Sequence, residues 1–573
     1  MKQIICYSIL FCILISCKQN ETQQTESAGS NGKGIVHCRP QTTDKDWYSA
    51  GTKAPKLEGL EGINFSITTK SKEAQDYFNQ GLMLSYGFNH AEAARSFYEA
   101  MRIDSTCAMC HWGYAYVLGP NYNGGMEKDN FERAYNATQK AMGLSDNSTK
   151  LEKDLIQALS YRYEKTPPED RSDLDIAYSQ AMKKVFHKYP ANPDVGALYA
   201  ESLMDLHPWD LYEKNKEPKS WTPEIVATLE HLIESNPKHP GVHHFYIHAV
   251  EASAHPQKGL ESAKVLQTLV PGAGHLVHMP SHIYIRTGDY HLGSLANMEA
   301  AKADSTYITS CHAQGVYPLA YYPHNYHFLA ATATLEGNSQ LAWTAAKKVQ
   351  VNTAKDIMRQ PEWGTLQHYY TIPYYVAVKF GMWETILEQP MPEVDLIYPK
   401  AVLHYARGMA FLGKNHLSEA EKELDKLNGI AKDTSLKSLT IWEINTAYDL
   451  IQIASNLLSA EIATHKKQYK QAISMMNEGV AIEDQLNYNE PPDWFFSIRH
   501  HLGAVYIKAG MYSEAEKVYR DDLQTWRKNG WALIGLHRAL EAQKKTIDAA
   551  GVKEEFDRAW QYADKMITSS SPL

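Results

Sequence analysis

The feature that most constrains the fold of this chain is a helical periodicity that recurs from residue 73 onward. Apolar residues at i, i+3, i+4 and i+7 form blocks of roughly 12 to 16 residues, separated by Gly, Asp, Asn or Pro. Almost no stretch alternates apolar and polar residues with the period of two that marks a strand. The sequence therefore predicts an all-α protein.

Internal comparison shows that the helices come in pairs. The stretch YFNQGLMLSYGFNHAEAARSFYEAMRIDS (77–105) has small residues at Gly81, Ala93 and Ala100 and a large apolar residue at Phe97. In the tetratricopeptide-repeat (TPR) family, these positions carry a small residue in the first helix, a small residue at the helix crossing, a large apolar plug and another small residue. The resemblance implies a helix–turn–helix unit with Phe97 between its helices.

The same pattern returns at 501–523, with Gly503 and Tyr519, and more loosely at 404–424. The chain resembles the tetratricopeptide-repeat (TPR) family, whose period is about 34 residues. The resemblance implies an α-α solenoid of roughly a dozen helix pairs. Such pairs stack into a right-handed superhelix, and the first helix of each pair lines a concave groove that binds partners.

The N-terminus predicts a targeting segment. Residues 1–16 contain Lys2 and an apolar run, Ile4–Ile15, that is shorter than the roughly 20 residues of a membrane-spanning helix. The stretch Leu-Ile-Ser-Cys, which ends at Cys17, resembles the lipobox of bacterial lipoproteins, and the resemblance implies that Cys17 is lipidated. An ordinary cleaved signal and a short membrane anchor are the alternatives. The expected location is the bacterial cell envelope, with the lipid as membrane anchor.

The rest of the chain divides into three predicted parts. Residues 17–56 are the lipidated cysteine and a polar tether, 57–388 are an N-terminal TPR array with a histidine-lined groove, and 389–573 are a C-terminal TPR array. The segment 305–320 breaks the repeat period and predicts a loop. A net charge of -9 without a long basic run excludes nucleic acid as the expected partner.

Several longer stretches, among them HPGVHHFYIHAVEAS and GHLVHMPSHIYIRTGDY, resemble a group of bacterial TPR lipoproteins. This resemblance extends over nearly the whole mature chain. It implies a fold but no activity, so a function has to be inferred from individual residues.

Histidines are concentrated where the repeat register points into the groove. In the TPR family, helix positions 2, 5, 9 and 12 line the concave wall, and the turn Gly288-Asp289-Tyr290 sets the register of one repeat. Neighbouring repeats follow from their own turns. The groove residues predicted in this way are His244, His248, Glu251, His275, His278, His282, His324, His327 and His368.

Imidazoles so close together repel when protonated and are therefore mostly neutral near pH 7, the state that binds metals. The i, i+4 pairs His244/His248 and His278/His282 are spaced to share a zinc, copper or iron ion, and Glu251 offers an oxygen ligand. Pro280 is expected to kink its helix. The alternative is that these histidines bond to tyrosines, carbonyl groups or a bound peptide in a wet groove.

The motif Cys107-Ala-Met-Cys110-His111 fits the C-x-x-C-H pattern of c-type haem attachment. The same residues open a repeat helix whose next positions suit packing, and a disulfide or two free thiols explain the cysteines equally well. Attachment of haem c is therefore not the expected role.

Three functions remain open at this point. The leading prediction is a groove that binds a protein, peptide or small ligand, with a transition metal at the histidines. The second is a metal-dependent enzyme in which Glu251 is a ligand or general base. The third is a mono-haem redox protein.

Overall fold

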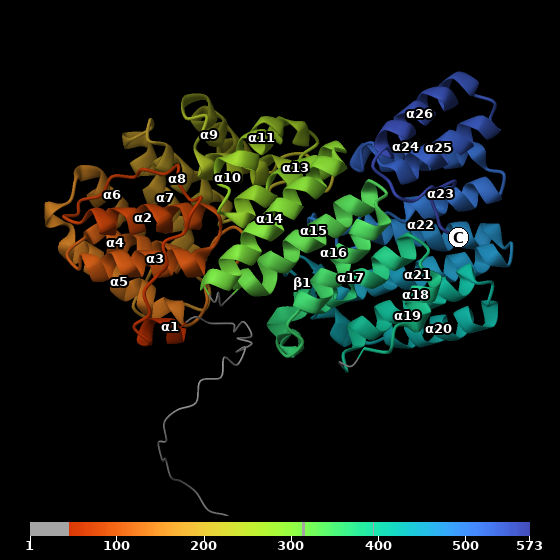
Figure 1. The fold of residues 1–573 in the computed structure, drawn as a ribbon, viewed down its shortest axis with the longest axis horizontal. Helices are drawn as coiled ribbons and strands as arrows, with labels where there is room; N and C mark the ends of the chain where they lie inside the picture. The colour runs from red at the N-terminus through yellow and green to blue at the C-terminus, as the bar shows by residue number, and fades with distance from the viewer. Residues whose placement is uncertain (1–44, 312–315, 393–394) are drawn as a thin grey trace, which may run out of the picture. The chain divides into compact units, whose positions relative to one another are not determined.

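The computed structural model describes residues 45–311, 316–392 and 395–573. In these residues, helices follow one another in antiparallel pairs along the chain (Figure 1). The first elements are α1 (Lys45–Ser49), α2 (Lys72–Tyr86), α3 (His90–Ile103), α4 (Ala108–Val117), α5 (Asn130–Leu144), η1 (Ser145–Asn147), α6 (Lys150–Leu159), α7 (Ser172–Lys188), α8 (Pro193–Met204), α9 (Thr222–Ser235), α10 (Pro240–Glu251), η2 (Pro256–Gly259), α11 (Leu260–Leu269), α12 (Gly274–His278) and α13 (Pro280–Thr287).

The second part begins with a long helix and includes one short antiparallel hairpin, β1 (Thr440–Ile441) and β2 (Asn445–Thr446). Its helices are α14 (Tyr290–Cys311), η3 (Tyr317–Tyr321), α15 (Tyr322–Leu335), α16 (Ser339–Asn352), η4 (Ile357–Arg359), η5 (Pro361–Trp363), α17 (Gly364–Lys379), α18 (Trp383–Glu388), α19 (Ile397–Gly413), α20 (Leu417–Ile430), η6 (Thr434–Lys437), α21 (Ala447–His465), α22 (Tyr469–Glu483), α23 (Arg499–Lys508), α24 (Tyr512–Thr525), α25 (Gly530–Ala542) and α26 (Thr546–Ala559).

Consecutive helices pack on one another, as in α2 with α3, α19 with α20 and α25 with α26. The predicted all-α architecture of tetratricopeptide-type helix pairs is confirmed.

Aromatic side chains between glycines hold the pairs together. A Cβ atom on Gly81 would lie 2.9 Å from the Phe97 ring, and one on Gly113 of the next pair would lie 2.4 Å from it. Tyr519 fills the same position beside Gly503, where a Cβ atom would lie 2.3 Å from the ring. The glycines therefore let two helices reach a single buried ring, as the repeat pattern predicts.

Part of the segment assigned to the tether packs on the body. Tyr48 of α1 lies edge-on to Tyr98, with ring centroids 5.1 Å apart, and Tyr77 donates a hydrogen bond to the Ala54 carbonyl. Residues 45–56, which the sequence assigned to the tether, therefore belong to the folded body. The signal segment and Cys17 lie outside the described residues.

The prediction of a loop at 305–320 was wrong for the residues that are described. Helix α14 continues to Cys311, and Tyr317–Tyr321 forms a single π-type turn that leads directly into α15. The Tyr317 hydroxyl donates to Asp304 Oδ1 at 2.7 Å and accepts from the His275 backbone N–H. These buried contacts anchor the insertion against α12, so it extends the core.

The buried apolar side chains form two large clusters, one drawn from residues 54–321 and the other from residues 285–560. The two clusters overlap along the chain between α13 and η3. The division of the repeats into arrays at residues 388 and 389 stays a prediction.

Candidate metal centre

Helices α10, α12, α13 and α15 bring seven of the predicted groove residues together. Helix α10 carries His244, His248 and Glu251, α12 and α13 carry the next three histidines, and α15 carries the last. We call this set the histidine cluster: His244, His248, Glu251, His275, His278, His282 and His324. None of its side chains is more than 9% exposed.

The helices of the cluster begin where the register requires. Pro240 occupies the first turn of α10, Gly274 opens α12, and Pro280 opens α13 after a break at Met279. The predicted interruption at Pro280 is thus present. It leaves His278 and His282 on the same side of the broken helix, with their ring centroids 4.8 Å apart.

Four of the six histidines are fixed through Nδ1. His244 Nδ1 lies 2.6 Å from the Tyr86 carbonyl oxygen, and His248 Nδ1 lies 2.7 Å from Glu251 Oε1. A carbonyl or carboxylate oxygen can only accept, so each Nδ1 carries the proton and each Nε2 keeps a free lone pair. Such partners on the far nitrogen are the usual way in which proteins orient metal-binding histidines.

His278 and His282 show the same arrangement. His278 Nδ1 lies 2.7 Å from Asn297 Oδ1, and Asn297 Nδ2 donates to the Gly293 carbonyl, which fixes the amide orientation. His282 Nδ1 lies 2.6 Å from Glu251 Oε2. The Nε2 atoms of the two histidines are 2.9 Å apart. Two lone pairs therefore face each other, an arrangement that a shared cation stabilises.

Glu251 links the two halves of the cluster. One oxygen accepts from His248, and the other accepts from His282 and from the Tyr488 hydroxyl at 3.1 Å. Burial opposes its ionisation, but the two histidines lower the pKa of its carboxyl well below the usual range. Glu251 thus acts as a buried anion that orients two imidazoles.

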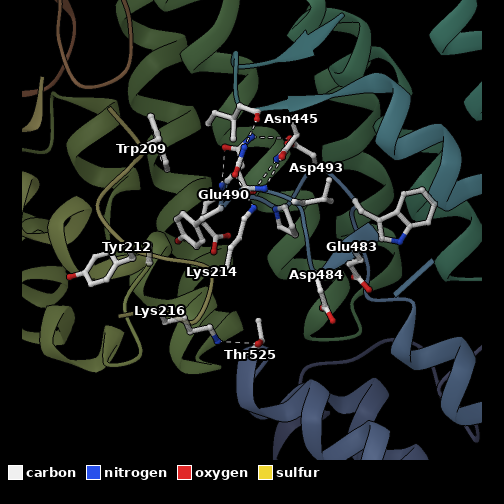
Figure 2. A pocket seen from close by; sticks show the side chains of 18 of the residues that line it. Trp209, Tyr212, Lys214, Lys216, Asn445, Glu483, Asp484, Glu490, Asp493 and Thr525 are labelled. Carbon is white, nitrogen blue, oxygen red and sulfur yellow. Dashed lines mark hydrogen bonds between the residues drawn. The ribbon is translucent and has the colours of Figure 1, made fainter. Parts of the chain in front are cut away.

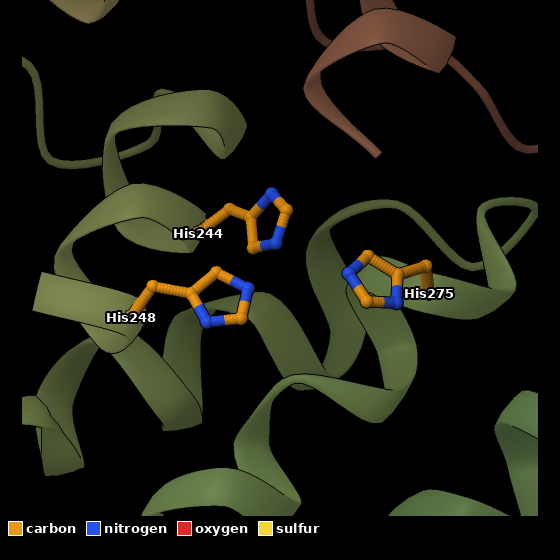
Figure 3. Close-up of side chains that lie close together, drawn as sticks. All are labelled: His244, His248 and His275. Atoms are coloured by element: carbon orange, nitrogen blue, oxygen red, sulfur yellow. The ribbon is translucent and has the colours of Figure 1, made fainter. Parts of the chain in front are cut away.

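Several ring nitrogens of the cluster have no hydrogen-bond partner among the described residues. They are His244 Nε2, His248 Nε2, both nitrogens of His275 and His324 Nδ1. Figure 3 shows the rings of His244, His248 and His275 turned toward a common space.

Three groups of side chains in the cluster have donor atoms that all lie within 4.8 Å of one another. The groups are His244/His248/His275, His278/His282/His324 and His248/Glu251/His282. Imidazole nitrogens are ligands that suit zinc, copper and iron. The buried cluster therefore has the composition of a transition-metal site.

Burial also sets the protonation state. It lowers the pKa of His248 and, reinforced by the neighbouring imidazoles, lowers the pKa values of His244, His275, His278 and His324 well below the usual range. These histidines are neutral at pH 7, as the sequence predicts, but burial rather than repulsion is the main cause.

His327 and His368 form a separate pair. The His327 ring stacks on Phe495 with centroids 5.2 Å apart, and His368 Nδ1 lies 2.8 Å from the Tyr398 hydroxyl. Their rings are 5.6 Å from each other, and neither belongs to one of the three groups above. The register placed them correctly on their helices, but the structure does not bring them into the cluster.

The prediction of an open groove was wrong for these histidines, because segments distant in sequence cover them. A cavity of about 30 Å³ touches His248, His275, His282 and His324. It is closed by a set of side chains from other parts of the chain, namely Asn123, Trp209, Tyr321, Trp442, Asn489 and Glu490.

A larger cavity of about 550 Å³ shares Trp209, Asn489 and Glu490 with this small one (Figure 2). Glu490 is fully buried, and neither of its oxygens has a hydrogen-bond partner among the described residues. Burial raises the pKa of its carboxyl to about 7. Sequence reasoning missed Glu490, because its only local signal was a proline-rich turn.

The C-x-x-C-H motif lies elsewhere. Cys107 and Cys110 are buried and form a disulfide, and His111 Nε2 contacts the Ser105 carbonyl at 3.4 Å. In this state neither sulfur is free to form a thioether bond with haem.

The chain matches no protein-family model and no curated protein sequence. Its fold is similar to those of several solved helical-repeat structures. The human IFIT1 dimer with m7Gppp-AAAA matches at 13% identity over 87% of this chain and 92% of that chain, with a TM-score of 0.31. The APC/C hetero-tetramer Cut9–Hcn1 matches at 13% identity over 90% and 80%, with a TM-score of 0.31. Yeast Tom70 matches at 13% identity over 85% and 97%, also with a TM-score of 0.31.

At these values the comparisons concern the fold and carry no argument about a ligand. None of the described helices is long and apolar enough to cross a membrane.

Proposed function

We propose that this protein is an exported, lipid-anchored helical-repeat protein that binds a transition metal through its histidine cluster. The observation that supports this most directly is the set of buried imidazole nitrogens without a hydrogen-bond partner. A buried polar atom left unpaired costs about 1–3 kcal/mol. Four histidines of the cluster have such an unpaired nitrogen, and a metal ion that accepts their lone pairs would offset this cost.

Orientation supports the same proposal. In His244, His248, His278 and His282, the nitrogen that is not needed for a metal is occupied; Nε2 of His244 and His248 has no partner among the described residues, and Nε2 of His278 and His282 meet each other at 2.9 Å. A cluster that served only to fill the interior would gain from pairing both nitrogens. Fixed Nδ1 partners are instead expected where Nε2 has a ligand of its own.

Metal analysis tests the proposal. Purified protein is incubated with zinc, copper, iron and manganese salts, dialysed, and its metal content is measured. The triple variant His248→Ala, His278→Ala, His324→Ala should lose the metal and keep its helical circular dichroism. His327→Ala is the matched control, since it removes an equally buried histidine outside the cluster and should retain the metal.

Acidification through about pH 6 is expected to release the metal, because protons compete for the imidazole lone pairs. Wild-type protein that remains metal-free in all four salts would contradict the proposal.

The second candidate function is a metal-dependent enzyme acting on a small molecule. The larger cavity favours it, because about 550 Å³ lies within the roughly 300–1,000 Å³ typical of small-molecule pockets. Glu490 lines both this cavity and the small cavity beside the histidines. This arrangement supports a small ligand rather than a long peptide as the partner, and it would give a reacting molecule a path to the metal.

Turnover distinguishes the two functions. A binding protein would release an added small ligand unchanged, whereas an enzyme would convert it only when metal is present. Export and lipid attachment are supported by the N-terminal sequence alone, and they are tested at Cys17 below.

A further inference from the structure

The six histidines of the cluster form two sets of three, and both sets occupy the same positions of the repeat. His278 and His282 follow His244 and His248 by 34 residues each, which is one repeat. In both cases an i, i+4 pair is completed by the histidine at position 2 of the next repeat. The first set is His244, His248 and His275, and the second is His278, His282 and His324.

Each set has the geometry of one metal site. Its donor nitrogens lie within 4.8 Å of one another. Ligands at about 2.0–2.1 Å from one ion lie about 2.9–3.5 Å apart, depending on the angle between them. The Nε2 atoms of His278 and His282, at 2.9 Å, already have that spacing.

The two sets are neighbours with a common wall. The rings of His248 and His282 are 5.4 Å apart, and those of His275 and His278 are 5.6 Å apart. Glu251 orients one histidine of each set. The small cavity is lined by two histidines from each set, so it lies between them.

We propose that the cluster is a dinuclear centre that holds two ions, each bound by three histidines. This proposal rests on the proposed metal function. Three protein ligands leave each ion an open position, and the cavity between the sets is the space for a small ligand that bridges both ions. The bridging ligand would reach this space from the larger cavity past Glu490.

The next repeat provides a comparison within the same chain. The corresponding positions there are His327, Ala331 and His368, so the set has two histidines. Its rings pack on Phe495 and Tyr398 and belong to no group of close donors. Loss of one histidine from the pattern thus coincides with loss of the site geometry.

Charge balance guides the choice of probe. A buried charge is costly unless an opposite charge lies nearby. The cluster contains Glu251, which accepts hydrogen bonds from His248 and His282, and Glu490 faces the same cavity but already lies 3.9 Å from the Arg286 guanidinium. With so little negative charge at the cluster, two monovalent ions leave less unbalanced charge than two divalent ions. Copper(I), which binds imidazole, is therefore the sharpest probe.

The experiment counts copper. Purified full-length protein is loaded with copper(I) without oxygen, freed of excess by competition with a weak chelator, and analysed for copper per chain. The wild-type protein should hold two. His244→Ala and His324→Ala each disrupt one set and should hold one, while His327→Ala should hold two.

The wild-type count does not depend on how any variant folds. One copper per chain would overturn the dinuclear centre and leave the proposed metal function standing. No copper would overturn the dinuclear centre, and it would overturn the proposed function as well if the protein also stays metal-free in the four salts. Two coppers that persist in His244→Ala and His324→Ala would place the ions outside the two sets and would also overturn the proposal.

Discussion

Glu251→Gln should weaken metal binding without removing any residue that would contact the metal. The glutamate oxygens accept from His248 Nδ1 and His282 Nδ1 at 2.7 and 2.6 Å. Glutamine has the same shape but only one accepting oxygen, and its amide nitrogen donates. One of the two histidines must then present the Nδ1 lone pair to that amide, which moves its proton to Nε2.

A protonated Nε2 cannot bind a metal, so this single substitution removes one ligand through the tautomer. Loss of a hydrogen-bond partner behind a metal-binding histidine typically costs about 10–100-fold in affinity, which is about 1.4–2.7 kcal/mol. Because a ligand is lost as well as an orienting contact, we expect at least the upper end of this range.

The assay is a chelator competition titration at pH 7.5, which gives the dissociation constant of the tightest bound ion. Tyr488→Phe is the matched control. It removes the third contact to Glu251, a 3.1 Å hydrogen bond, and leaves both histidine contacts in place. The control should bind metal within a few-fold of the wild type, since both hydrogen bonds from the histidines to Glu251, which set the two tautomers, remain.

Nitrogen-15 spectra of histidine-labelled protein report the tautomers directly. The metal-free wild type should show His248 and His282 protonated at Nδ1, and Glu251→Gln should show one of them protonated at Nε2. A Glu251→Gln protein with wild-type affinity would refute the reasoning, because the carboxylate would then have no part in preparing the ligands.

Three further predictions concern acid stability, packing and export. Burial lowers the pKa of His368 to about 3. As the pH falls, the unfolded chain therefore takes up a proton at this residue before the folded chain does. The contribution of His368 to the free energy of unfolding is complete above about pH 6.5 and is lost toward pH 3. At pH 5.5 the loss from this group is about 1.4 kcal/mol, measurable by urea unfolding against His368→Gln. Gly113→Ala should destabilise the protein by about 1–3 kcal/mol in the same assay, because its Cβ would lie 2.4 Å from Phe97. Cys17→Ser should accumulate as an unprocessed precursor without lipid, and normal maturation on a gel would contradict the lipobox.

Much of the fold could be predicted because its determinants are local. Gly81 and Phe97 stand 16 residues apart, and their match to the positions of the TPR family implies two helices that meet around a ring. The starts of α10, α12 and α15 follow from turns within the same repeat. The insertion at 305–320 was misjudged because Tyr317 is held by Asp304 and by the backbone of His275, two contacts that no local pattern indicates.

The register predicted which histidines would meet, but it could not predict how their rings turn. His324 and His327 lie one turn apart on α15, yet one contacts the cluster and the other stacks on Phe495. The difference depends on what each ring meets across the interface, and Phe495 comes from a segment far along the chain. A helical register fixes a position on a helix and leaves the neighbouring surface open.

The burial of the cluster follows from contacts over still longer distances. Tyr488 bonds to Glu251 across 237 residues, and Lys214 donates to the Gln485 carbonyl across 271. An open groove would leave the imidazoles hydrated, with water on every free nitrogen. The segment around Glu490 separates the cluster from bulk solvent and leaves unpaired ring nitrogens beside a small cavity. The same segment lines the larger cavity, so it lies between that cavity and the histidines.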